Sequence, residues 1–230
     1  PLLANIYLHY VLDLWVHQWR KRHAKGDVII VRYADDFVVG FQHEAEAKRF
    51  LDDLRERLRK FGLELHDDKT RLLRFGQFAA RDRERRGEGK PDTFEFLGFA
   101  HICGKARDGR FLLLRHSSAK RMRAALTVIK QELRRRRHEW VARQGAWLRT
   151  VVRGWFGYHA VPTNRRRLDQ FWFAVRDLWW RSLRRRSQKT RGLGVKFARL
   201  VEHWLPYPQL RHPWPDVRFD ARTRGRSRVQ

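Results

Sequence analysis

Residues 27–41 read DVIIVRYADDFVVGF, and this stretch decides how the first half of the chain folds. It contains two short runs rich in β-branched and aromatic residues, Asp27–Tyr33 and Phe37–Phe41, which is the composition of β-strands. Only Ala34-Asp35-Asp36 separates them, so the connection must be a tight turn. We therefore predict a β-hairpin that carries two adjacent carboxylates at its tip.

The two carboxylates, Asp35 and Asp36, suggest a metal site. Adjacent carboxylates repel one another unless a cation lies beside them. Hard oxygen ligands on rigid strand ends suit Mg²⁺, and two such ions can activate an attacking hydroxyl and stabilise a leaving oxygen in phosphoryl transfer. For an isolated Asp-Asp pair, a simple turn is the better interpretation, because Asp is common in turns. The surrounding sequence has to decide between the two.

Helical and strand patterns alternate around the hairpin. Residues 2–20 carry apolar side chains at steps of three and four, the spacing of an amphipathic helix. Residues 44–61 repeat that spacing and are followed by Gly62, a helix-ending residue. Further strands are predicted at Arg71–Phe78, Thr93–Cys103 and Phe111–Leu114, with a polar glycine-rich loop at residues 81–92 and a turn at Gly104–Gly109.

Nearly all of the positive charge lies in the second half. The 230-residue chain has a formal net charge of +27. Residues 1–114 contain 22 Lys and Arg against 18 Asp and Glu, whereas residues 115–230 contain 30 against 7. This excess requires a polyanionic partner, and nucleic acid is the first candidate. A membrane surface is disfavoured, because the arginines extend over more than a hundred residues instead of one amphipathic helix.

The second half is predicted to be helical. Apolar stripes predict one helix that begins at Ser117 or Ser118, a second around Trp147–Trp155 and a third around Leu168–Trp179. Residues 206–230 are rich in Pro and Arg and are predicted to be irregular. The single cysteine, Cys103, excludes an internal disulfide and fits a reducing, cytoplasmic location.

Arginine clusters stand at the ends of these predicted helices. They are often only solvated surfaces, but a net charge of +23 over residues 115–230 makes contacts with phosphates the better explanation. The residues that we expect to bind nucleic acid are Arg134, Arg135, Arg136, Arg137, Arg153, Arg165, Arg166, Arg167, Arg184, Arg185 and Arg186.

A family resemblance decides between the turn and the metal site. The motif Tyr33-Ala34-Asp35-Asp36 between apolar strands resembles the catalytic motif of reverse transcriptases. In order and spacing, Pro1–Leu8, Phe61–Thr70 and Phe94–Phe99 are similar to neighbouring motifs of the group II intron reverse transcriptases. Val152–His159 resembles the thumb, or maturase, motif of the same proteins. Several motifs in one order form a much more specific signal than four letters.

The resemblance implies an α+β fold in three parts. Residues 1–114 would be the last part of a polymerase palm, an antiparallel sheet with helices. Residues 115–205 would be an all-α basic thumb or maturase domain, and residues 206–230 a basic irregular tail. The implied activity is RNA-directed DNA polymerase with two Mg²⁺ ions, combined with intron RNA binding and splicing assistance. The partners would be intron RNA, an RNA template, a DNA primer and dNTPs, without a membrane.

The resemblance also assigns roles to individual residues. Asp35 and Asp36 would be the catalytic, metal-binding carboxylates. Tyr33 and Ala34 would lie close to the primer terminus and the incoming nucleotide. Lys69 would be catalytic, donating a proton to the departing pyrophosphate or neutralising it, although a solvated lysine is the alternative.

The motif Phe96-Leu97-Gly98 would belong to a hairpin that grips the primer. Its alternation with Phe94 is equally compatible with one face of a buried strand.

One departure from the family limits the expected activity. Reverse transcriptases use a third catalytic aspartate and a fingers region, which would lie upstream of Pro1 and are absent from these 230 residues. We therefore expect that this chain alone does not extend a primer, and robust Mg²⁺-dependent extension would overturn that expectation. The alternatives are a non-catalytic RNA-binding splicing factor, a remnant of a truncated reverse transcriptase, or a reverse transcriptase from outside the intron family. Val152–His159 and the basic tail make the last of these weaker.

Overall fold

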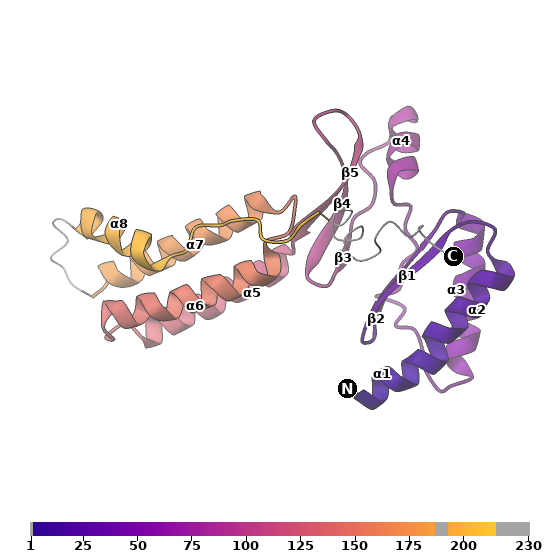
Figure 1. The fold of residues 1–230 in the computed structure, drawn as a ribbon, viewed down its shortest axis with the longest axis horizontal. Helices are drawn as coiled ribbons and strands as arrows, with labels where there is room; N and C mark the ends of the chain where they lie inside the picture. Colours follow the sequence, from indigo (N-terminus) through magenta and orange to yellow (C-terminus); the bar gives the residue numbers. More distant parts are fainter. Residues whose placement is uncertain (1, 187–192, 215–230) are drawn as a thin grey trace. The chain divides into compact units, whose positions relative to one another are not determined.

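The computed structural model of the chain describes residues 2–186 and 193–214 (Figure 1). Their fold is α+β, as the sequence predicts, with two small antiparallel sheets among helices. The chain divides into two compact units, Pro1–Asp92 and Thr93–Gln230, which we describe separately as the first and second unit. Within the described ranges, none of the helices combines the length and the apolar character needed to cross a membrane.

The first unit opens with a helix that contains a widened turn. The elements α1 (Leu2–Leu8), η1 (His9–Asp13) and α2 (Leu14–His23) follow one another without a break, and η1 is a π-helical turn. In this turn the Leu14 N–H donates to the His9 carbonyl, five residues earlier. A π-helical turn shifts the helix face that follows it, and such turns are frequent at functional sites.

The predicted hairpin forms next to this helix. Strand β1 (Val28–Tyr33) pairs antiparallel with β2 (Asp36–Phe41), and the register runs from Val28 opposite Phe41 to Tyr33 opposite Asp36. Ala34 and Asp35 are therefore the two turn residues. The position of the carboxylates at a strand tip is confirmed.

One face of the hairpin is covered by helices. Helix α3 (Glu44–Arg59) packs with η1 and α2 against the inner face of the strands, as Figure 1 shows. The helix ends in a glycine turn, in which Leu63 N–H donates to the Leu58 carbonyl and Gly62 has a φ of +66°. The buried core of this unit consists of Val11, Leu12, Val16, Trp19, Val28, Phe50, Leu54 and Leu58.

The strand predicted at Arg71–Phe78 is wrong. Residues 71–75 have no regular structure, and helix α4 (Gln77–Arg85) occupies the end of that stretch and part of the predicted loop at 81–92. Residues 77–85 consist largely of strong helix formers, namely Gln, Ala, Arg and Glu. Among the described residues, 71–75 pair with no strand of either sheet, so their apolar side chains alone are not sufficient for a strand.

The second unit begins with a three-stranded antiparallel sheet. Its strands β3 (Phe94–Phe96), β4 (Phe99–Lys105) and β5 (Phe111–Ser117) are adjacent in chain order. Leu97 and Gly98 form the turn between β3 and β4, with φ values of +50° and +79°. The single strand predicted at Thr93–Cys103 is therefore wrong, because Leu97 and Gly98 turn the chain back and β3 and β4 form a hairpin.

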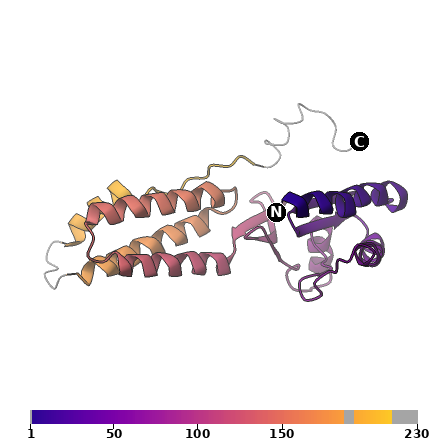
Figure 2. The ribbon, with the colours of Figure 1, turned by 90° about the horizontal axis from the view of Figure 1, so that it is seen from below.

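Four helices of the described chain follow the sheet, and their apolar faces form the buried core of the second unit. They are α5 (Ala119–Arg135), α6 (Val141–His159), α7 (Arg165–Arg184) and α8 (Leu193–Trp204), and Figure 2 shows α5, α6 and α7 running alongside one another. The first three correspond to the predicted helices, whereas α8 was not predicted. Their apolar stripes bury Ile129, Leu133, Leu148, Val152, Phe156, Leu168, Phe171, Val175, Trp179 and Val201, among others.

The segment after α8 matches the predicted irregular tail as far as it is described. Residues 206–214 contain neither helix nor strand, although Arg211 and His212 donate their N–H groups to the Ala160 carbonyl. Residues 215–230, which hold most of the predicted tail, lie outside the described residues, as does Pro1.

A buried polar cluster joins the sheet to the helices of the second unit. Asn164 is fully buried, accepts the Ser117 N–H at 2.9 Å and donates to the Ser117 hydroxyl at 2.8 Å. The His159 Nδ1 lies 3.2 Å from the same hydroxyl. These bonds tie β5 to the α6–α7 connection within the second unit, which begins at Thr93. The three functional parts remain a prediction.

This cluster predicts a pH dependence of stability. Burial, together with the nearby Arg121, lowers the pKa of His159 to about 4 from an ordinary value near 6.5. As the pH decreases, the imidazole of His159 therefore binds a proton in the unfolded chain before it does so in the folded chain. The contribution of His159 to stability is fully present above pH 6.5 and is lost as the pH decreases toward 4. We expect His159 to account for a loss of about 2 kcal/mol over this window, after allowance for solvent screening.

Urea unfolding of wild type and His159→Gln at pH 7 and pH 4.5 measures this contribution. The variant should lose less stability between the two pH values than the wild type. His101 and His116, whose pKa values are also lowered by burial, keep part of the dependence in both proteins. An equal loss in the two proteins would show that His159 is not the group that titrates.

Candidate functional site

The tip of the β1–β2 hairpin, residues Tyr33–Asp36, holds the predicted carboxylates. Asp36 is the first residue of β2 and lies opposite Tyr33, while Asp35 is the second turn residue. All four residues are exposed. Among the described residues, neither the Asp35 nor the Asp36 carboxylate takes part in a hydrogen bond or an ion pair, so their oxygen atoms are available to a ligand from solution.

The turn has an unusual backbone. Ala34 has a φ of +54°, in the left-handed region where a side chain with a Cβ is disfavoured by about 1 kcal/mol. Two-residue hairpin turns normally place Gly or Asn at such positions. Strained non-glycine residues of this kind occur mostly where the surrounding structure holds them, and often at functional sites.

Arg32 holds this turn and was missed by the sequence analysis. Its Nη1 donates to the Ala34 carbonyl at 2.8 Å and to Asn5 Oδ1 at 3.1 Å. Its Nε and Nη2 donate to the two carboxylate oxygens of Asp13 at 2.8 and 2.6 Å. Hydrogen bonding to Arg32 lowers the pKa of Asp13, and the same bond raises the pKa of Arg32. A charged residue at an inward-facing strand position is the signal that could have revealed it.

Lys69 lies in a turn that follows α3. Its N–H donates to the His66 carbonyl at 3.1 Å, and its side chain is exposed. No hydrogen bond or ion pair among the described residues connects Lys69 with Asp35 or Asp36. The catalytic role of Lys69 remains a proposal.

The Leu97–Gly98 turn of the second unit is held by the helices that follow. The Tyr158 hydroxyl donates to the Leu97 carbonyl at 2.7 Å, and the Ser118 N–H donates to the Gly98 carbonyl at 2.9 Å. The Arg121 side chain fills the space beside Gly98, because a Cβ on this glycine would lie 2.9 Å from its Cδ. The turn is therefore fixed by residues of α5 and α6.

The chemistry of the two free carboxylates fits Mg²⁺. Both supply hard oxygen atoms at a rigid strand end, which is the type of ligand that Mg²⁺ prefers. The part of the chain that the structure describes contains no group of three or more His, Cys, Asp or Glu residues placed to hold a metal ion. Asp35 and Asp36 would therefore need a further ligand, such as substrate phosphates or another carboxylate, to complete a metal site.

The segment that carries this site matches a known protein family. Residues 1–101 match the family described as reverse transcriptase (RNA-dependent DNA polymerase). No curated protein matched the chain. The matched residues make up less than half of the 230-residue chain, so the match shows a similarity of this segment to RNA-dependent DNA polymerases.

The matched segment, residues 1–101, contains the hairpin tip, Lys69 and the Leu97–Gly98 turn. It therefore includes every residue that the sequence analysis assigned to catalysis, metal binding or primer binding. It ends within β4, so the helices of the second unit and their arginines lie outside the matched residues.

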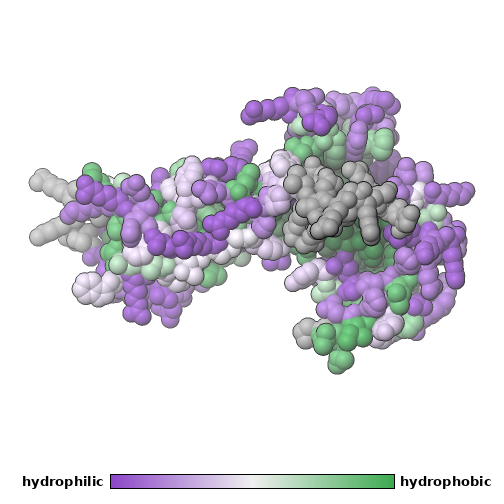
Figure 3. Space-filling view, in the orientation of Figure 1, coloured by the Kyte–Doolittle hydropathy of each residue, from purple (hydrophilic) through white to green (hydrophobic). Residues whose placement is uncertain are grey.

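The arginines that follow the matched segment differ in whether they have partners within the protein. Among the described residues Arg134, Arg153 and Arg166 are exposed and make no ion pair or side-chain hydrogen bond. Figure 3 shows hydrophilic side chains over much of the visible face of the helices. These three residues can contact a phosphate without first giving up an internal partner.

Several other arginines that the sequence predicts to bind nucleic acid have partners within the protein. Arg136 is largely buried, pairs with Glu132 at 3.1 Å and Glu139 at 3.2 Å, and lies over the Trp147 ring. Arg135 also pairs with Glu132, Arg165 pairs with Asp169, and Arg167 donates to Gln170. Arg184 lies over the Trp180 ring. Single buried nitrogens of Arg137 and Arg186 have no hydrogen-bond partner within the described chain. Arg185 is exposed.

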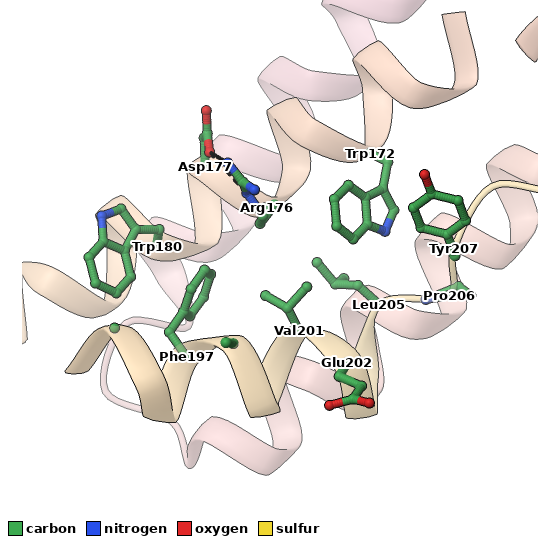
Figure 4. Close-up of a pocket in the computed structure, with 12 residues that line it drawn as sticks. Trp172, Arg176, Asp177, Trp180, Phe197, Val201, Glu202, Leu205, Pro206 and Tyr207 are labelled. Carbon is green, nitrogen blue, oxygen red and sulfur yellow. Dashed lines mark hydrogen bonds and ion pairs between the residues drawn. The ribbon is translucent and has the colours of Figure 1, made fainter. Parts of the chain in front are cut away.

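A groove between α7 and α8 contains none of the predicted site residues. It has a volume of about 730 Å³, and Figure 4 shows Trp172 and Trp180 of α7 facing Phe197 and Val201 of α8 across it. At its edge Arg176 pairs with Asp177 at 3.1 Å. The apolar lining and this internal ion pair do not favour a catalytic role.

Proposed function

We propose that this chain is the palm remainder and the thumb of a group II intron reverse transcriptase that also acts as a maturase. The observation that carries the proposal is the pair Asp35 and Asp36, exposed and free of internal partners at the tip of a tight hairpin in a reverse transcriptase segment. The basic helices that follow, with residues 115–230 at +23, support an RNA partner. The resemblance of Val152–His159 to the maturase motif supports the choice of an intron RNA.

The polymerase part of the proposal assigns a role to each residue of the tip. Asp35 and Asp36 would hold Mg²⁺, which when bound activates the primer hydroxyl and stabilises the leaving pyrophosphate. Tyr33 and Ala34 would lie against the primer end and the incoming nucleotide, and the exposed ring of Tyr33 offers a surface for stacking. Lys69 would neutralise the pyrophosphate, and Phe96, Leu97 and Gly98 would support the primer.

Binding to RNA tests the maturase part. We expect the chain to bind a group II intron RNA with nanomolar affinity, roughly 1000-fold more tightly than a folded RNA of equal length and different sequence. Filter binding at a fixed salt concentration measures the ratio. Equal affinity for the two RNAs would reduce the second half to a general nucleic-acid-binding surface.

Primer extension tests the polymerase part. We expect no Mg²⁺-dependent extension by residues 1–230 alone, because two carboxylates without a third align metal ions poorly. We expect extension by a reverse transcriptase that contains them. If the larger protein assists splicing and extends no primer, the non-catalytic splicing factor is the correct function.

A further inference from the structure

Arg32 occupies a position at which a charged side chain is costly. It alternates with Val28 and Ile30 on the inner face of β1, and its side chain is only 15% exposed. Its cross-strand neighbour on that face is Phe37. Removing a guanidinium from water in such surroundings is unfavourable unless hydrogen bonds compensate. Something other than packing must therefore explain why an arginine stands here.

The hydrogen bonds of Arg32 connect two parts of the first unit. Three of them reach the first helix, two to the carboxylate of Asp13 and one to Asn5. The fourth reaches the Ala34 carbonyl in the hairpin turn. The pair with Asp13 is bidentate, which fixes the plane of the guanidinium as well as its position. The nitrogen that faces Ala34 is therefore held in a defined place.

The Ala34 carbonyl is well placed to control the carboxylates. It belongs to the peptide group that joins Ala34 to Asp35, so its orientation decides how the Asp35 backbone leaves the turn. Ala34 itself has the disfavoured φ of +54°. Without a partner for this carbonyl, the turn could relax toward a less strained conformation and move both aspartates. The hydrogen bond from Arg32 opposes that relaxation.

The π-helical turn places Asp13 where Arg32 can reach it. Asp13 is the last residue of η1, and the turn is held from the other side by Arg57, whose Nε donates to the Val11 carbonyl at 3.2 Å. His9 also lies 3.4 Å from the Asp13 carboxylate. A continuous connection therefore runs from the first helix through Asp13 and Arg32 to the turn.

We propose that Arg32 is a positioning residue that, anchored by Asp13 and Asn5, holds the Ala34–Asp35 peptide and thereby fixes the carboxylates of Asp35 and Asp36. The ordering of the turn is independent of any activity. That the ordered carboxylates serve a metal ion rests on the proposed function. The two statements are tested by separate measurements.

Amide hydrogen exchange in the 230-residue chain tests the ordering. Arg32→Ala should speed exchange at Tyr33 and Asp36, the last pair of the β1–β2 ladder, by about tenfold or more, the equivalent of roughly 1.4 kcal/mol of lost local protection. The matched control is Arg20→Ala, which also removes an arginine that donates to a backbone carbonyl in the same unit, that of Val28 at the opposite end of β1. The control should leave exchange at the two residues within about twofold of wild type, and Arg32→Lys should lie between, because lysine cannot bind Asp13 in the bidentate manner.

Equal exchange at Tyr33 and Asp36 in Arg32→Ala and Arg20→Ala would overturn the proposal, since the effect would then be general destabilisation. Binding of Mn²⁺ to a larger reverse transcriptase that contains this chain, followed by electron paramagnetic resonance, gives the second readout, because Asp35 and Asp36 need a further ligand to complete a metal site. If Asp36→Asn abolishes a Mn²⁺ site in that protein, Arg32→Ala should weaken the site by about tenfold, and an unchanged affinity would contradict the proposal. If no Mn²⁺ site depends on Asp36, the proposed function fails, and the exchange measurement still decides the role of Arg32.

Discussion

Replacement of Asp36 by Asn in a reverse transcriptase that contains this chain should lower Mg²⁺-dependent DNA synthesis by on the order of 1000-fold. The amide keeps the size of the side chain but removes the negative charge that a divalent ion requires. Asp36 is exposed and its carboxylate has no internal partner among the described residues, so the fold should be unaffected, with a change in unfolding free energy within about 0.5 kcal/mol. Single-turnover primer extension and urea unfolding measure the two quantities.

Asp27→Asn is the matched control for this experiment. Asp27 is also an exposed aspartate and lies at the opposite end of the same hairpin, where its backbone carbonyl accepts the Gln42 N–H. Its replacement should leave DNA synthesis within about twofold of wild type, because surface substitutions outside special features have small effects. If both variants lose activity equally, or if Asp36→Asn retains it, the assignment of the hairpin tip as the catalytic centre is wrong.

Replacement of Arg134, Arg153 and Arg166 together by Ala should produce the second large effect, a loss of RNA affinity. Each unpartnered guanidinium that contacts a phosphate contributes roughly 1.5 kcal/mol, so the three together are expected to account for on the order of 1000-fold in affinity. The slope of log affinity against log salt concentration should decrease by about one unit for each residue. Filter binding over a series of salt concentrations measures both.

The control for the arginine variant removes the same amount of charge. Arg135, Arg143 and Arg165 are also exposed, but they pair with Glu132, Glu139 and Asp169 respectively. Their joint replacement by Ala changes the net charge equally and removes arginines that are already engaged within the protein. A smaller loss in this control is expected, and an equal loss would mean that only the total charge matters and that the three unpartnered arginines make no special contacts.

Local patterns were sufficient wherever neighbours in the sequence decide the structure. The hairpin follows from two apolar runs and a two-residue connection, and the position of Asp35 and Asp36 at its tip follows from the same pattern. The helices α3, α5, α6 and α7 follow from apolar stripes at helical spacing. The failure at Arg71–Phe78 has the opposite cause, because a strand also depends on pairing with a second strand, and the local pattern does not contain that pairing.

The candidate site shows the same division. The position of Asp35 and Asp36 at the hairpin tip was predicted correctly. Arg32, which contacts both Asp13 and the turn, was not predicted, and neither was Asp13. Asp13 and Arg32 are 19 positions apart, and no spacing rule connects a helix residue with a strand residue at that distance. In the same way, the Tyr158 hydroxyl meets the Leu97 carbonyl across 61 positions.

The sequence alone determined the acidic hairpin, the helical stripes and the concentration of positive charge after residue 114, because each depends on residues close together in the chain or on simple composition. Only the tertiary structure decided which charges are free and which are engaged. Arg136 and Arg153 look alike in the sequence, yet one is enclosed by two glutamates and a tryptophan and the other is exposed without a partner in the described chain. The physical reason is that hydrogen bonds and ion pairs form between groups brought together by packing, and that proximity is a property of the folded chain.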